Sequence, residues 1–160
     1  MGVSQNQPNV SPEHLAQIQR TMDRRDASEE WRASPEYRDQ WLSEGFAQYF
    51  AALWAERSLG RGVFNGIIRS MQQWSVQESD QGAVYLGYRI GHFKGDSRRF
   101  RAVIYNKGAM VLHMLRRLVG DEAFFTGLRR YYNTWRFAKA GTDDLRRAVE
   151  AESGVDLERF

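Results

Sequence analysis

The chain has 160 residues, a formal net charge of +3 and no cysteine. This length suits one domain that buries about two thirds of the surface exposed by its unfolded chain. The absence of cysteine excludes a disulfide framework, a thiolate metal site and a cysteine nucleophile. Because acidic residues are scattered among the basic ones, the small positive charge does not predict a nucleic-acid partner.

The first ten residues are polar, so we expect a disordered tail over residues 1–10 and a single helical domain over residues 11–160. The tail has neither a basic region nor an apolar run, and it therefore does not read as a signal peptide. No stretch of about 18 apolar residues occurs, so we expect no membrane span and no membrane partner. These features do not fix the cellular compartment.

Helix signals follow one another along the rest of the chain. Ser11 followed by Pro12 is typical of a helix start, and the helix that it opens has only a thin apolar stripe. A second, strongly apolar helix should begin between Ser34 and Asp39 and end before Gly60. Its predicted core stripe consists of Leu42, Phe46, Tyr49, Phe50 and Leu53. Further helices are expected at about 63–74, 96–120, 121–135 and 142–153, and the glycine-rich stretch 82–95 is expected to be a loop.

The most informative stretch is Trp41-Leu42-Ser43-Glu44-Gly45-Phe46-Ala47, which places Glu44 near the start of the second helix. Glu44 shares one side of this helix with small residues that would let another helix come close. A carboxylate on a packed surface needs a partner. Taken alone, however, Glu44 has a simpler explanation, because the helix dipole favours acidic residues in the first turn.

A second motif, Tyr105-Asn106-Lys107-Gly108-Ala109, lies in the predicted helix 96–120. Glycine inside a helix costs about 1 kcal/mol relative to alanine, so we expect another segment to approach the backbone at Gly108. Tyr105 taken alone reads as a packing residue with its hydroxyl at the surface. Lys107 and Arg101 read as solvated side chains.

Together the two motifs resemble the paired signature of the aminopeptidase N family of zinc metallopeptidases, of the gluzincin type. The resemblance covers residues 34–160 and leaves residues 11–33 outside. It implies that Glu44 corresponds to the third zinc ligand and Tyr105 to the phenol that stabilises the tetrahedral intermediate. It also implies an all-α fold, an irregular bundle of about six helices like the helical half of a thermolysin-like catalytic domain. The family removes N-terminal residues from peptides by means of zinc-activated water.

The His-Glu-x-x-His segment of that family is absent from this sequence. At the family's usual spacing before Glu44, the two histidine positions fall on Thr21 and Arg25, and the general base falls on Met22. The three histidines lie in separate elements, and His14 is the least implausible of them as a ligand. They are His14, His92 and His113. One carboxylate does not hold zinc at useful affinity, so we expect this chain to bind no zinc by itself.

Three hypotheses follow. The chain is a fragment or a shortened relative of a zinc-dependent aminopeptidase, catalytically incomplete alone, whose parent family acts on peptide substrates. Alternatively, it is a non-catalytic helical module that binds a protein partner, or self-associates, through the groove left by the missing zinc-binding helix. In the third, another polypeptide supplies His-Glu-x-x-His in trans. The side-chain preference of any peptide substrate is not readable from these residues.

Overall fold

The computed structural model describes residues 38–78, 80, 82–86 and 97–160. All of them belong to one compact unit, Pro35–Phe160. The described residues are helical and contain no strand, which confirms the predicted all-α class. The first predicted helix, which begins at Ser11, and most of the predicted loop 82–95 lie outside the described residues.

Two helices joined at a glycine open the described part of the chain. Helix α4 spans Gln40–Leu59, and α5 spans Arg61–Gln77. Gly60 between them has φ +91°, a backbone angle that glycine adopts without steric cost. The predicted stop at Gly60 is therefore confirmed. A single 3₁₀ turn, η2 (Val84–Leu86), follows.

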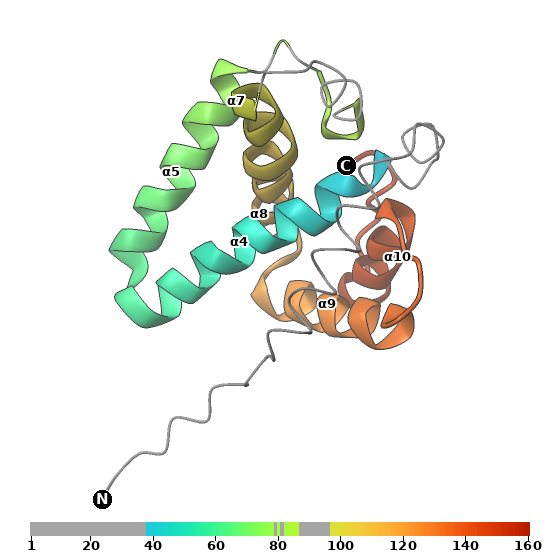
Figure 1. Cartoon of the computed structure of the whole chain (residues 1–160). Helices are drawn as coiled ribbons and strands as arrows, with labels where there is room; N and C mark the ends of the chain where they lie inside the picture. Colours follow the sequence, from blue (N-terminus) through green and yellow to red (C-terminus); the bar gives the residue numbers. More distant parts are fainter. Residues whose placement is uncertain (1–37, 79, 81, 87–96) are drawn as a thin grey trace, which may run out of the picture. The chain divides into compact units, whose positions relative to one another are not determined.

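The predicted helix 96–120 is found as three consecutive helical segments. These are α7 (Ser97–Phe100), the π-helix η3 (Arg101–Lys107) and α8 (Gly108–Val119). After Gly120 come α9 (Asp121–Trp135) and α10 (Thr142–Ser153), which lie side by side (Figure 1). Helix α4 packs against α5, η3 and α8. No helix within the described ranges has the length and apolar character needed to cross a membrane.

The core lies where α4, η3, α8 and α9 meet, and α10 packs against α9 and contributes Leu145 and Val149 to it. Its largest fully buried side chains come from five different elements of the chain. They are Tyr49, Val103, Ile104, Leu112, Phe124 and Val149.

The predicted core stripe of α4 is partly wrong. Phe50 is 48% exposed, whereas Trp41, Gly45 and Ala52 are buried. The reason is that α4 meets η3 and α8 through its small residues, so the buried face is centred on Gly45 and Ala52.

The predicted stripe of the helix 96–120 also changes after residue 107. Met114 and Leu118 are more than half exposed, whereas Ala109 and Leu112 are buried. A π-helix bonds residue i to i+5 and holds more residues per turn than an α-helix. The segment η3 therefore shifts the inward face of α8 by one residue. The positions in helical register with Tyr105, such as Ala109 and Leu112, face the core in place of those in register with Ile104.

Candidate functional site

The two sequence motifs meet at a glycine–glycine crossing. A methyl group on Gly45 would lie 2.9 Å from the carbonyl carbon of Gly108 and 3.2 Å from the amide nitrogen of Ala109. A methyl group on Gly108 would lie 3.1 Å from the carbonyl oxygen of Trp41 and 3.3 Å from the Cα of Gly45. The backbones of α4 and α8 therefore touch where neither side has a side chain. This confirms the expected close approach to Gly108.

A side-chain bond continues the contact one turn further along α4. Gln48 Nε2 donates a hydrogen bond of 3.4 Å to Oδ1 of Asn106, which is 7% exposed. Gln48 follows Glu44 by four residues and lies on the same side of the helix. Asn106 follows Tyr105 directly. The side of α4 that carries Glu44 thus borders the π-helical segment that carries Tyr105.

Tyr105 lies within η3 and is half-buried. Its ring meets that of Phe100 edge to face, with ring centroids 6.1 Å apart. Short π-helical segments inside α-helices are frequent at functional sites. Sequence patterns missed this segment, because a π-turn leaves no signal in residue type apart from the costly glycine at its end.

Lys107 does not point freely into solvent, contrary to the expectation from sequence. Its Nζ donates a hydrogen bond of 2.6 Å to the carbonyl oxygen of Gly82. This bond ties the segment before η2 to the end of η3. Arg101, at the other end of the π-helix, is exposed.

Glu44 is half-buried and is the fifth residue of α4, not a residue of its first turn. The first turn of α4 contains no acidic residue. Because the dipole effect fades within that turn, it explains Glu44 less well than the sequence suggested. Among the described residues, Glu44 has neither a hydrogen-bond nor an ion-pair partner.

The donor set around Glu44 does not fit a zinc ion. Within the described ranges, no group of three or more histidine, aspartate or glutamate side chains is placed to hold a metal. His113 Nδ1 lies 3.0 Å from the Tyr49 hydroxyl, and Tyr49 lies on the core side of α4, away from Glu44. His14 and His92 lie outside the described residues.

Hydrogen bonds join the start of α4 to the start of α10. Asp39 Oδ1 accepts hydrogen bonds from the amide of Thr142, at 3.1 Å, and from its hydroxyl. Trp41 Nε1 donates to Thr142 Oγ1 at 3.2 Å. Asp39 therefore caps α10, a helix that begins about a hundred residues later, at Thr142. Sequence reasoning missed these hydrogen bonds because the residues that they join are far apart in the chain.

A polar network centred on the buried Arg116 joins α4, α8 and the start of α9. Arg116 is 8% exposed, and its guanidinium donates to Asp121 through two bonds of 2.8 Å, to Glu56 at 3.2 Å and to the Tyr49 hydroxyl at 3.5 Å. The guanidinium also stacks on the ring of Phe125, 5.2 Å from its centroid. These partners satisfy a cation that would otherwise be costly to bury.

The network shifts the pKa values of its members. The hydrogen bond to Asp121 is the main cause that raises the pKa of Arg116. The same bond lowers the pKa of Asp121. Burial raises the pKa of Tyr49. Burial, followed by the charges of Arg116 and Arg117, lowers the pKa of His113 and favours its neutral form.

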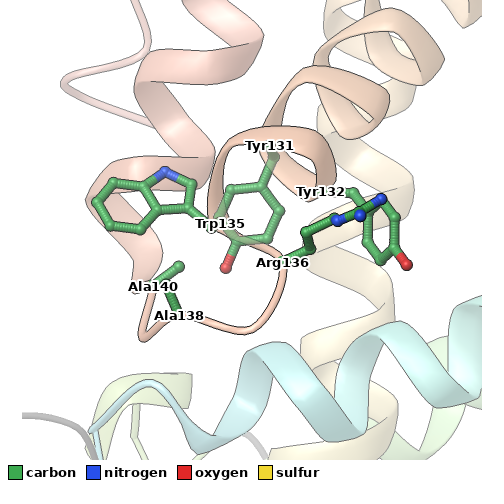
Figure 2. A pocket seen from close by; sticks show the side chains of 6 residues that line it. All are labelled: Tyr131, Tyr132, Trp135, Arg136, Ala138 and Ala140. Atoms are coloured by element: carbon green, nitrogen blue, oxygen red, sulfur yellow. The ribbon is translucent and has the colours of Figure 1, made fainter.

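A small cavity of 160 Å³ lies at the corner between α9 and α10 (Figure 2). It is lined by Tyr131, Tyr132, Trp135, Arg136, Ala138 and Ala140. The lining contains no carboxylate or imidazole and takes nothing from α4 or η3. It is therefore not part of the site defined by Glu44 and Tyr105.

The described residues form an all-α unit in which the two sequence motifs cross, and comparison with known proteins gives the family of the chain. The family model described as "Peptidase family M1 domain" matches residues 33–160. The chain therefore belongs to peptidase family M1.

Named relatives are aminopeptidases. The chain is 30% identical to aminopeptidase N of Lactococcus lactis subsp. lactis over 128 residues, which are 76% of this chain and 15% of the relative. It is 29% identical to aminopeptidase N of Streptomyces lividans over 128 residues, 78% of this chain and 15% of the relative. It is also 29% identical to aminopeptidase M1 of Arabidopsis thaliana over 125 residues, 75% of this chain and 14% of the relative. The chain thus spans about 15% of the length of the first two relatives. No solved structure matches it significantly.

Proposed function

We propose that this chain carries the glutamate-and-tyrosine half of an aminopeptidase catalytic site and does not hydrolyse peptides by itself. It is a fragment or a shortened relative of a zinc-dependent aminopeptidase. The substrate of the completed site is a peptide with a free N-terminus, as the names of the relatives suggest.

The observation that supports this proposal is the crossing of α4 and α8 at Gly45 and Gly108. This contact brings the Glu44 side of α4 next to the segment that carries Tyr105. Among the described residues no group of three or more histidine, aspartate or glutamate side chains is placed to hold a metal, and the sequence contains no His-Glu-x-x-His segment. Because these residues do not fit a zinc ion, we derive no catalytic step through the metal. In this proposal Glu44 is a ligand only when the other ligands are supplied, and the Tyr105 phenol stabilises developing negative charge on the reacting carbonyl oxygen.

The experiment is complementation in trans. The chain is mixed with a polypeptide that supplies the His-Glu-x-x-His helix, and hydrolysis of an aminoacyl reporter is followed with zinc present. We expect activity only in the mixture, abolished by Glu44→Ala and reduced about 10²- to 10³-fold by Tyr105→Phe, the usual effect of losing one oxyanion donor. The control is Tyr85→Phe, an exposed tyrosine on η2. Activity that survives Glu44→Ala, or that falls as far with Tyr85→Phe, would contradict the proposal.

A second candidate function is a non-catalytic helical module that binds a protein partner or self-associates. The observation that favours it is the surface of α4 that faces away from the core, where Phe50 is 48% exposed and Trp54 is 65% exposed. Exposed aromatic side chains on one face mark interaction sites more often than chance. A strict monomer at high concentration in light scattering would speak against self-association.

A further inference from the structure

The small cavity between α9 and α10 has the size and the walls that suit a single ring. Its volume is 160 Å³, and a cavity of about 150 Å³ holds one benzene molecule. Its aromatic walls are Tyr131, Tyr132 and Trp135, and such walls favour a flat apolar group because rings stack or meet edge to face. Tyr132 is 63% exposed, so the cavity is open to solvent. Figure 2 shows Tyr131 between Trp135 and Arg136, with its hydroxyl toward the loop that joins the two helices.

This loop begins with a type II β-turn over residues 135–138. The amide of Ala138 donates a hydrogen bond of 2.9 Å to the carbonyl oxygen of Trp135. Arg136 has φ −57° and ψ 131°, and Phe137 has φ +66°. A type II turn needs a positive φ at its third residue, where glycine is the usual choice. Phe137 therefore occupies a position that strains its backbone.

Burial does not offset this strain. The side chain of Phe137 is 99% exposed, so it contributes no packing to the core. Backbone strain of this kind is concentrated at active sites, ligand clamps and switch segments. What the ring of Phe137 does contact is the neighbouring guanidinium: Cζ of Arg136 lies 5.5 Å from the ring centroid. The strained turn thus places an aromatic ring behind the guanidinium of Arg136.

Arg136 is the charged residue among the six that line the cavity. It is exposed, and its guanidinium has neither a hydrogen bond nor an ion pair with any described residue. Stacking on Phe137 uses the face of the guanidinium and leaves the N–H groups at its edge free to donate. Two parallel N–H groups of arginine match the two oxygens of a carboxylate.

The opposite end of the cavity is electronegative. Burial raises the pKa of Tyr131, and the negative charges of Asp144 and Asp39 raise it further. Both carboxylates accept hydrogen bonds from the backbone at the start of α10. An anionic group is therefore disfavoured beside Tyr131 and favoured beside Arg136.

We propose that the cavity between α9 and α10 binds a small carboxylic acid that carries one apolar ring. The ring lies against Tyr131 and Trp135, and the carboxylate pairs with Arg136, whose guanidinium Phe137 holds in place. A free acid and the C-terminal phenylalanine of a peptide share this chemistry. The cavity takes no residue from α4 or η3, so this inference stands or falls independently of the proposed peptidase half-site.

The first test is an NMR titration of the full chain that follows the indole N–H signal of Trp135, assigned with Trp135→Phe. Phenylacetate is the probe, phenylacetamide supplies the ring without the charge, and acetate supplies the charge without the ring. We expect a saturable shift with phenylacetate, binding of phenylacetamide that is about 3- to 10-fold weaker, and no saturable shift with acetate. The peptide Gly-Gly-Phe and its C-terminal amide repeat the comparison. Whichever acid binds more tightly, free or peptidyl, is the source that the site selects.

The second test uses variants of the lining. Arg136→Gln should abolish the preference for the acid over the amide. Arg129→Gln is the matched control and should keep the preference, because Arg129 is an exposed arginine of the same helix that does not line the cavity. Ala138 lines the cavity and is exposed, so Ala138→Leu should fill the cavity without disturbing the core and weaken both ligands about 10-fold or more. Circular dichroism checks that each variant is folded.

The substitution Phe137→Gly separates binding from stability. Glycine relieves the strain of the turn, so the melting temperature should rise by about 2–4 °C. The preference for the acid over the amide should fall in the same variant, because the guanidinium loses the ring that orients it. A merely structural role for Phe137 would not move the two measurements in opposite directions.

Four results would each overturn the proposal. The first is the absence of a saturable shift with phenylacetate at every concentration up to its solubility. The second is an equal shift with acetate, which indicates adventitious binding of an anion only. The others are a preference for the acid that survives Arg136→Gln and binding that survives Ala138→Leu.

Discussion

The Gly45–Gly108 crossing makes a strong prediction about the substitution Gly45→Ala. In an ordinary helix this change is favourable, because alanine is preferred over glycine by about 1 kcal/mol. Here the added methyl group would lie 2.9 Å from the carbonyl carbon of Gly108. The obstacle is backbone and cannot rotate away, so α4 must move away from α8.

The magnitude follows from two opposing terms. Overpacking a tight contact costs about 1–3 kcal/mol, and the rigid backbone places this case toward the upper end. After the helix preference of about 1 kcal/mol is subtracted, Gly45→Ala should lower the free energy of unfolding by about 1–2 kcal/mol. For a unit of this size, the melting temperature should fall by roughly 3–8 °C.

Gly66→Ala on α5 is the matched control. Gly66 also lies within a helix, but a methyl group there would meet no atom within 4 Å. This variant should gain stability by about 0.5–1 kcal/mol from helix preference alone. Both variants are measured by urea unfolding followed by circular dichroism. If Gly45→Ala proves as stable as the wild type or gains stability as Gly66→Ala does, the crossing is not as described.

Three further predictions concern the polar contacts. Asp39→Ala removes the carboxylate that caps the start of α10 and should lower the free energy of unfolding, measured by urea titration, by about 1 kcal/mol. No loss would show that the cap does not contribute to stability. Arg116→Met leaves the hydrogen-bond acceptors of Arg116 without their donor and should lower the free energy of unfolding by about 3 kcal/mol. A variant more stable than the wild type would contradict the network. The lowered pKa of His113 means that the folded state resists protonation. Stability should therefore decline as pH falls below about 6.5, and His113→Gln should flatten that decline in melting curves between pH 7 and pH 5.

Local signals predicted the helices and their ends well. Gly60 and Gly120 have positive φ and end their helices, as glycine after an apolar run suggests. The cost of glycine inside a helix also predicted the close approach at Gly108, which the crossing confirms. Each of these features is signalled by a single glycine in its local sequence, so its physical cause is visible in the sequence.

Apart from the close approach at Gly108, contacts between distant segments were not predicted. Two examples are the hydrogen bonds between Asp39 and Thr142 and the network around Arg116. Both depend on which helices pack together, and the residue types do not indicate which partners they bond. The π-helix η3 was missed for a related reason: it shifts the inward face by one residue without changing composition. The two errors in predicted core stripes, at Phe50 and Met114, both follow from such tertiary choices. The roles of Glu44 and Tyr105 remain predictions.

Zinc content of the purified chain is the measurement that decides whether one carboxylate without an imidazole pair can form a working site. The chain is equilibrated with zinc and dialysed, metal is quantified by atomic emission, and the same sample is assayed with an aminoacyl reporter. We predict well below one zinc per chain and no hydrolysis, because Glu44 alone is a weak ligand. One zinc per chain that is lost in Glu44→Ala, together with hydrolysis that a chelator abolishes, would contradict this prediction.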